Sequence, residues 1–361
     1  MPIFQLPDYL SLESGKVLEN VEIHYEIVGE PIDGGSNVIV ICHTLTGGIN
    51  IVDSPLWSFV GQGQLIDTDQ YCIISLGTLG GVNESTGPLS CSPSGEPYGP
   101  DFPVVTVVDS VKAHNRVLDA LGIYQAKAII GGSYGGFCAY AWLALKPSFF
   151  DLAVIFQSAL RCSAHTIALW ALCRDLITSD ARWRNGRYTE KDFQEMHGFT
   201  QMIALNRILQ LGHEKFESKF PPSTRLETQD LTADFWDKHC AIDDFLLMKP
   251  GKTLVNHKSL DPNTILSTLR SSSLFDLERS FPDLWTRWKN LSTTIIQLPC
   301  VQDWRYPTRE MHQLHRQFKQ VGVDAYYRPT SSQFGHGSFL YDPKSLKIAI
   351  PLLERFFRDC N

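Results

Sequence analysis

The stretch Ala128-Ile129-Ile130-Gly131-Gly132-Ser133-Tyr134-Gly135-Gly136 joins an apolar run, a Gly-x-Ser-x-Gly turn and the start of a second apolar segment. Such a turn connects a buried strand to a helix so sharply that the residues two before and two after the serine crowd together. Glycine is therefore needed at 131 and 135, and the backbone of Ser133 is strained. The stretch predicts a nucleophile elbow, which holds the Ser133 hydroxyl at the positive end of a helix.

Strands and helices alternate on both sides of this turn. Apolar or alternating segments predict strands over 20–29, 37–42, 71–76, 127–130, 152–156, 293–298 and 323–328. Helical spacing predicts helices over 106–121, from 134 to about 144, over 308–320 and over 344–358. Between about 161 and 289 the alternation stops, and the sequence is helix-like and rich in Trp, Phe, Leu, Lys and Glu.

This order predicts an α/β-hydrolase fold, a doubly wound and mostly parallel sheet with an inserted helical cap. We expect residues 1–160 and 290–361 to form the catalytic core. Residues 161–289 are expected to form the cap that shapes the substrate pocket. The Gly/Ser/Pro-rich segment 77–103 is too long for a plain connection and is expected to be functional.

Composition narrows the class of partner. The chain has 361 residues, a net charge of −7 and no basic run, which argues against nucleic acid or an anionic membrane as partner. The first residues show no positive region followed by an apolar stretch, so we expect no signal peptide, and no run of 18 apolar residues occurs in the sequence. Nine cysteines occur without a CxxC pair, so we expect a reduced, cytoplasmic protein. Cys42 and Cys138 are interpreted as buried hydrophobes. No metal-ligand spacing occurs, and no metal site is predicted.

Two later segments supply partners for Ser133, whose hydroxyl needs a base that is itself oriented by a carboxylate. Asp303 directly follows the predicted strand 293–298, and His336 lies in a Gly-His-Gly setting after strand 323–328. Serine, then acid, then histidine is the order in which the catalytic residues occur along the chain in α/β-hydrolases. The alternative for Asp303 is a loop-capping aspartate.

An oxyanion hole needs two backbone N–H groups. One is expected from Tyr134, the residue after the nucleophile, and the other from Leu45 in the loop after strand 37–42. For His43, which begins this loop, we favour a structural role.

The chain resembles the homoserine O-acetyltransferase family over most of its length outside the cap. The segments that carry the resemblance are 43–47, 66–71, 79–81, 85–88, 97–103, 118–122, the elbow, Asp303-Trp304 and Gly335-His336. The resemblance implies Ser133, Asp303 and His336 as the catalytic residues and the amides of Leu45 and Tyr134 as the oxyanion hole. It also implies acyl-CoA as co-substrate without a bound cofactor, transfer to an acceptor hydroxyl in two steps, and a homodimer as one possible assembly.

Two positions depart from the family in ways that concern the small-molecule substrate. The family usually has Asp where this chain has Gly337, and that carboxylate meets the amino group of homoserine. The cap arginine that binds the amino-acid carboxylate aligns with Leu211, with Arg207 as a substitute. A site without both charges disfavours a zwitterion. We expect an acceptor other than homoserine or serine, a less polar alcohol or specialised metabolite that suits the tryptophans of the cap (Trp170, Trp183, Trp236).

Two other functions remain open. A serine hydrolase that cleaves an ester or a C–C bond would use the same acyl-enzyme and differ in admitting water to the second step. A binding protein on an inactive scaffold is the third reading, and the intact Ser, Asp and His set argues against it.

Overall fold

The computed structural model describes residues 1–52, 54, 57–82, 85–221, 241–247 and 260–357. An eight-stranded sheet in the order β1-β4-β6-β5-β7-β8-β9-β10 forms its centre. The strands are β1 (Ile3–Gln5), β4 (Glu22–Val28), β5 (Val38–Cys42), β6 (Cys72–Leu76), β7 (Ala126–Gly132), β8 (Phe150–Phe156), β9 (Thr294–Leu298) and β10 (Ala325–Tyr327). The pairs β1–β4 and β4–β6 are antiparallel, and the other neighbouring pairs are parallel. The predicted fold class is confirmed; a small hairpin of β2 (Leu10–Ser11) and β3 (Val17–Leu18) completes the strands.

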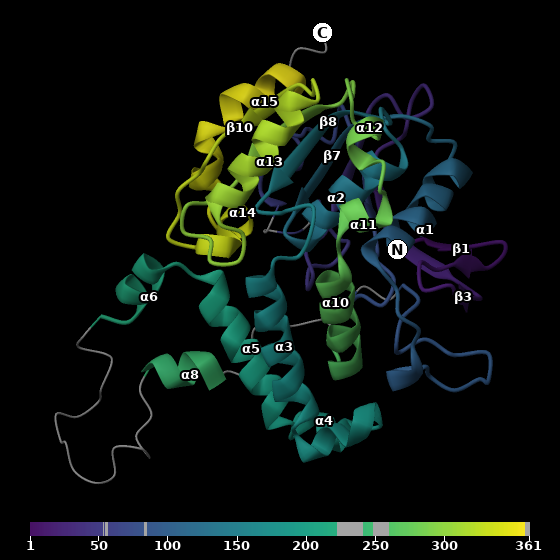
Figure 1. Cartoon of the computed structure of the whole chain (residues 1–361), viewed down its shortest axis with the longest axis vertical. Coiled ribbons are helices and arrows are strands. Elements are labelled where there is room, and N and C mark those ends of the chain that lie inside the picture. The colour runs from purple at the N-terminus through teal and green to yellow at the C-terminus, as the bar shows by residue number, and fades with distance from the viewer. Residues whose placement is uncertain (53, 55–56, 83–84, 222–240, 248–259, 358–361) are drawn as a thin grey trace.

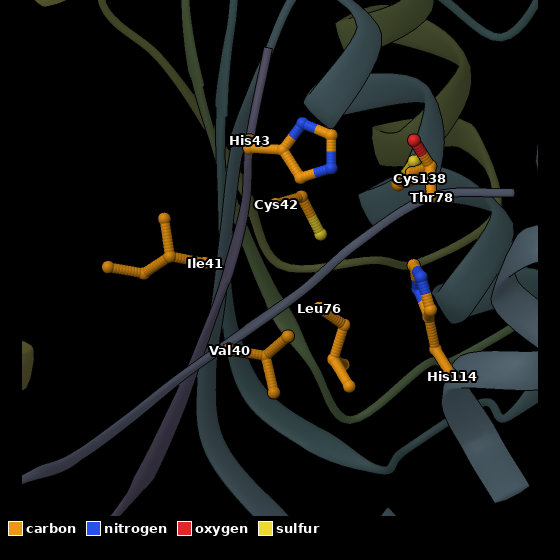
Figure 2. Close-up of a pocket in the computed structure, with 8 residues that line it drawn as sticks. All are labelled: Val40, Ile41, Cys42, His43, Leu76, Thr78, His114 and Cys138. Carbon is orange, nitrogen blue, oxygen red and sulfur yellow. The ribbon is translucent and has the colours of Figure 1, made fainter. Parts of the chain in front are cut away.

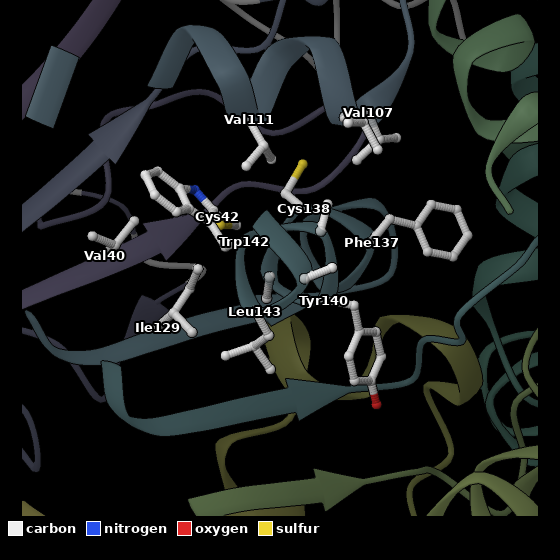
Figure 3. Packing of buried hydrophobic residues seen from close by; sticks show 14 of the residues in the cluster. Val40, Cys42, Val107, Val111, Ile129, Phe137, Cys138, Tyr140, Trp142 and Leu143 are labelled. Atoms are coloured by element: carbon white, nitrogen blue, oxygen red, sulfur yellow. The ribbon is translucent and has the colours of Figure 1, made fainter. Parts of the chain in front are cut away.

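Helices cover both faces of the sheet because its central strands are apolar on both sides. On one face, side chains from α1 (Val107–Ala120), α2 (Tyr134–Leu145), α11 (Leu277–Ser280), α12 (Leu284–Arg287) and α13 (Thr308–Gln320) share one core cluster with alternate strand residues. On the other face, α14 (Ser338–Tyr341) and α15 (Ile350–Phe357) share a second cluster with the remaining strand residues. Figure 3 shows the first cluster, in which α2 packs between α1 and the sheet. The strand and the helix that flank the elbow are therefore both packed into the apolar core.

One predicted helix is wrong in extent. The sequence predicts a helix over 344–358, but Pro343–Ile348 is a 3-10 turn and α15 begins only at Ile350; residue 358 lies outside the described residues. Pro351 explains the break, because proline lacks an N–H and its ring blocks the carbonyl four residues earlier, so it fits only in a first helical turn. The helix predicted over 308–320 has the observed bounds of α13.

Between β8 and α11 the described residues form helices that lie together beneath the sheet in Figure 1. They are α3 (Ala164–Thr178), α4 (Glu190–Gln194), α5 (His197–Gln210), α6 (His213–Lys219), α8 (Ala241–Leu247) and α10 (Pro262–Leu274). A third apolar cluster joins α3, α5 and α10, with Trp170 buried and Trp183 packed against it. Trp236 lies outside the described residues, and the division into core and cap domains stays a prediction. In the part of the chain that is described, no helix is long and apolar enough to cross a bilayer.

Candidate active site

Ser133 lies at the tip of the elbow, directly after β7 and before the first residue of α2. Its backbone has φ 56° and ψ −120°, a conformation that costs roughly 1–3 kcal/mol in a residue other than glycine. A Cβ at Gly131 would lie 2.2 Å from the carbonyl oxygen of Gly135, and a Cβ at Gly135 would lie 2.2 Å from that of Cys42. The close approach of β5, β7 and α2 explains why both positions are glycine.

The structure brings Ser133, His336 and Asp303 together in one chain of hydrogen bonds. His336 Nε2 lies 2.9 Å from Ser133 Oγ, and His336 Nδ1 lies 2.8 Å from Asp303 Oδ2. A carboxylate oxygen accepts, so Nδ1 carries the proton and Nε2 presents its lone pair to the serine hydroxyl. All three residues are buried. This geometry suits proton transfer from Ser133 to His336.

Backbone groups hold the acid and the base in place. Asp303 Oδ1 accepts from the N–H groups of Arg305 (2.7 Å) and Tyr306 (3.2 Å). His336 lies in a 3-10 turn over Gly335–Gly337, whose Gly335 carbonyl accepts from Gln157 Nε2 at 2.9 Å. Asp303 therefore also caps its own loop, so the loop-capping alternative and the predicted role occur in one residue.

Tyr306 is a site residue that the sequence reasoning missed. Its ring centroid lies 5.4 Å from that of His336, and its hydroxyl lies near enough to Ser133 for the serine to lower the pKa of Tyr306 against the larger effect of burial. Burial raises the pKa of the Tyr306 hydroxyl well above its ordinary value, so the group stays protonated. Its position three residues after Asp303 was the one available signal.

The loop after β5 lies beside the elbow, where Leu45 was predicted to donate its amide. This loop turns tightly, with the Gly47 N–H donating to the Thr44 carbonyl at 3.0 Å. His43 Nδ1 lies 2.8 Å from the Thr44 carbonyl and donates to it. Burial lowers the pKa of His43 to about 4, so its imidazole is neutral and holds the loop, in agreement with the structural role we favoured.

A narrow gap lies behind the elbow, lined by Cys42, His43, Thr78, His114 and Cys138 among others (Figure 2). It is too narrow to admit a water molecule, so it is a packing defect and no substrate site. Cys42 and Cys138 are buried as predicted, and burial raises the pKa of the Cys138 thiol to about 12. Among the described residues, no cluster of three His, Cys, Asp or Glu side chains could hold a metal ion.

The structure places Leu211 and Gly337 beside the histidine turn. Leu211 directly follows α5, and the carbonyl carbon of Leu211 lies 3.3 Å from where a Cβ on Gly335 would be. A Cβ on Gly337 would lie 2.6 Å from the ring of Tyr341. A side chain at 337 would therefore need Tyr341 to move.

Arg207 lies one turn earlier on α5 and has other partners. Its Nη1 donates to the carbonyls of Phe245 (2.9 Å) and Leu246 (2.8 Å) in the last turn of α8. Carbonyls in the last turn of a helix have no donor within that helix, and Arg207 supplies donors to these two in the last described turn of α8. A substrate carboxylate would have to compete with these bonds for the guanidinium.

Comparisons with known proteins agree with this geometry. The chain matches the family model of the α/β-hydrolase fold over residues 37–242. It is 33% identical to a homoserine O-acetyltransferase of Methanobrevibacter ruminantium, covering 99% of this chain and 73% of that protein. It is 32% identical to a homoserine O-succinyltransferase of Halothiobacillus neapolitanus, covering 92% of this chain and 83% of that protein.

Among solved structures, the crystal structure of esterase E22 is similar over 99% of both chains, with a TM-score of 0.87 and 25% identity. The relatives by sequence are thus acyltransferases, and a structural neighbour is an esterase. On fold, sequence and coverage together, this chain belongs to the homoserine O-acetyltransferase family of the α/β-hydrolase superfamily.

Proposed function

We propose that this protein is a serine-dependent O-acyltransferase that moves an acetyl or other acyl group from acyl-CoA to a hydroxyl of a small molecule other than homoserine. The observation that carries the proposal is the hydrogen-bonded chain from Ser133 through His336 to Asp303 at a strained elbow. Family membership favours transfer, because the relatives by sequence are named as acetyl- and succinyltransferases.

The first half-reaction acylates Ser133. Ser133 Oγ attacks the thioester carbonyl while His336 Nε2 takes the hydroxyl proton. In this proposal the amides of Leu45 and Tyr134 donate to the oxyanion of the tetrahedral intermediate. When the C–S bond breaks, the His336 proton passes to the thiolate and free CoA leaves.

The second half-reaction repeats these steps with the acceptor. Its hydroxyl gives a proton to His336 and attacks the acyl carbonyl, and the new ester leaves as Ser133 recovers its proton. Asp303 keeps the Nδ1 proton of His336 in place in both halves. The same two amides serve both tetrahedral intermediates.

The choice of acceptor rests on the positions beside His336. Gly337 offers no carboxylate for the amino group of homoserine, Leu211 offers no cation for its carboxylate, and Arg207 caps α8. A buried site that leaves an ammonium group unpaired disfavours it strongly. An acceptor without an amino group is therefore favoured.

A CoA-release assay with acetyl-CoA tests this choice. With homoserine or serine, the rate of CoA release is expected to show no saturation at millimolar acceptor concentrations. With some hydroxyl compounds that lack an amino group, the rate is expected to reach saturation in this range. Efficient acetylation of homoserine would restore the ordinary activity of the family and overturn the proposed acceptor class.

A second candidate is ester hydrolysis, favoured by the similarity to esterase E22. In that case water would take the place of the acceptor in the second half-reaction. Product partition with acyl-CoA separates the two functions. A transferase gives mostly the acylated acceptor once the enzyme is saturated with acceptor, whereas an esterase gives free acid at every acceptor concentration.

A further inference from the structure

Arg305 is a buried cation at the junction between the loop of Asp303 and the cap. The residue is 5% exposed, and its backbone N–H donates to Asp303 Oδ1 at 2.7 Å. Its guanidinium carbon lies 4.9 Å from the ring centroid of Trp170 on α3, and its Nη2 donates to Asn206 Oδ1 on α5 at 2.7 Å. The side chain thus extends from the candidate active site toward two cap helices.

The charge of this guanidinium has no partner among the residues that the structure describes. Its Nε is buried and donates no hydrogen bond, and no acidic side chain in the described ranges forms an ion pair with it. The Asp303 carboxylate attracts the Arg305 guanidinium electrostatically. Its oxygens, however, already accept hydrogen bonds from His336 and from two backbone amides. Arginine stays protonated even when buried. A buried positive charge without a partner is strongly unfavourable unless something neutralises it.

A purely structural role does not explain this charge. Arg207, next to Asn206 on α5, is satisfied by the carbonyls at the end of α8 and by the ring of Phe245. Arg305 has one hydrogen bond to an amide oxygen and one aromatic ring. Glutamine could make that hydrogen bond without a charge, so the cation itself points to an anion that arrives from outside the chain.

We propose that Arg305 binds a carboxylate carried by one of the two substrates. This inference rests on the proposed acyl transfer and narrows its substrate class. A planar carboxylate with two oxygens matches the parallel N–H groups of a guanidinium. Arg305 adjoins Tyr306, whose ring lies against that of His336, and its guanidinium reaches α3 and α5, so an anion held here lies on the side of the active site that faces these two helices.

The carboxylate has two chemical sources. It belongs either to a hydroxy acid that accepts the acyl group or to a dicarboxylic acyl group on CoA. Both place one negative charge beside Arg305, and neither brings the amino group for which Gly337 offers no partner. Matched pairs of compounds separate the two sources.

The donor pair is p-nitrophenyl hemisuccinate and p-nitrophenyl acetate, with p-nitrophenol release reporting acylation of Ser133. The acceptor pair is 3-hydroxybutyrate and 3-hydroxybutanamide with acetyl-CoA as donor. In the wild-type protein, we expect one pair to show a preference of roughly 100-fold in kcat/KM for the carboxylate member. A preference in the donor pair identifies the acyl group as the source, and one in the acceptor pair identifies the hydroxy acid.

Three substitutions tie this preference to Arg305. Arg305→Gln is expected to abolish it and Arg305→Lys to keep part of it, because lysine retains the charge without the planar fork. Asn206→Asp keeps the arginine and places a carboxylate from α5 beside it, so this variant is also expected to lose the preference. It tests the inference independently if Arg305→Gln does not fold. Arg182→Gln, an exposed cap arginine paired with Glu195, is the control and leaves the preference unchanged.

Two outcomes overturn the inference. One is a wild-type protein that treats both members of both pairs alike while p-nitrophenyl acetate still acylates Ser133, in which case the acyl-transfer chemistry stands and carboxylate recognition fails. The other is a carboxylate preference that survives both Arg305→Gln and Asn206→Asp. If no donor acylates Ser133, the proposed function fails together with this inference.

Discussion

The core around Ser133 and the junction of the Asp303 loop with α3 and α5 hold their polar groups in different ways. In the core, each member of the Ser133–His336–Asp303 chain is fixed by backbone contacts, by the turn at Gly335 and by close-packed glycines. At the junction, Arg305 depends on two side chains from separate helices, and its Nε has no partner among the described residues. If both proposals hold, the contrast teaches that the core sets the reaction type and that the junction sets the choice of substrate.

Removing the nucleophile tests the core most severely. Ser133→Ala is expected to lower turnover by roughly four to six orders of magnitude, and His336→Ala by a similar factor, because the two act as a unit. Steady-state CoA release measures the loss, and thermal denaturation checks that the fold is kept. Ser163→Ala, which removes the cap at the start of α3, serves as control. Activity retained in Ser133→Ala would mean that another group is the nucleophile.

Replacing the acid should lower turnover by a smaller factor than replacing the nucleophile or the base. Asp303→Asn is expected to reduce turnover by roughly three to four orders of magnitude, because an amide can stabilise the wrong tautomer of His336 and cannot balance an imidazolium. The same assay measures it. A nearly silent Asp303→Asn would show that a different carboxylate orients His336.

The packing of the elbow can be tested through stability. Gly135→Ala is expected to destabilise the fold by about 3 kcal/mol or more, since its Cβ would meet the carbonyl oxygens of Cys42 and His43. Gly95→Ala is the matched control, because Gly95 has φ 87° and nothing near its Cβ position, so only about 1–2 kcal/mol of backbone strain is expected. Urea unfolding measures both, and equal losses would contradict the crowding at the elbow.

The buried histidines behind the elbow predict a smaller, pH-dependent effect. Burial lowers the pKa of His114 to about 4 from an ordinary value of 6.5. The unfolded chain therefore takes up a proton near pH 6.5 while the folded state does not, and stability falls as the pH drops from 6.5 toward 4. Between pH 7 and pH 5 one such histidine accounts for about 2 kcal/mol.

His114→Gln isolates this effect, because an amide N–H can replace the bond from Nε2 to the Gly77 carbonyl, which is 3.0 Å long. Urea unfolding at both pH values should show a smaller pH-dependent loss in the variant than in the wild-type protein. An equal loss in both would mean that His114 titrates normally in the folded state.

Most of the core could be predicted from the sequence because its signals are local. The elbow, the apolar strands and the helical spacing over 308–320 each involve neighbours in the chain. The last helix was misplaced because one proline, Pro351, outweighed the helical spacing around it. Strand β1 was missed because a three-residue strand gains its stability from pairing with β4.

The junction could not be predicted in the same way. The inference about Arg305 depends on its contacts with Asn206, 99 residues away in the sequence, and with Trp170 on a different helix. Nothing local shows that its charge is buried. Arg207 likewise looked available as a substrate handle, and only the position of α8 reveals its partners.

Mass spectrometry after rapid mixing with acetyl-CoA tests the central claim most directly, namely that Ser133 carries an acyl group from CoA to a hydroxyl. Trypsin does not cut the Lys146–Pro147 bond, so the tryptic peptide spans residues 128–161 and contains Ser133, Ser148 and Ser158. Fragmentation assigns an ester to one of these serines and distinguishes it from a thioester on Cys138. We predict one acetyl group on Ser133, which persists without an acceptor and disappears when a suitable hydroxyl compound is added, with its acetyl ester as product. An unmodified Ser133, or an acetyl group that is lost to water at the same rate with and without every acceptor, would contradict the account.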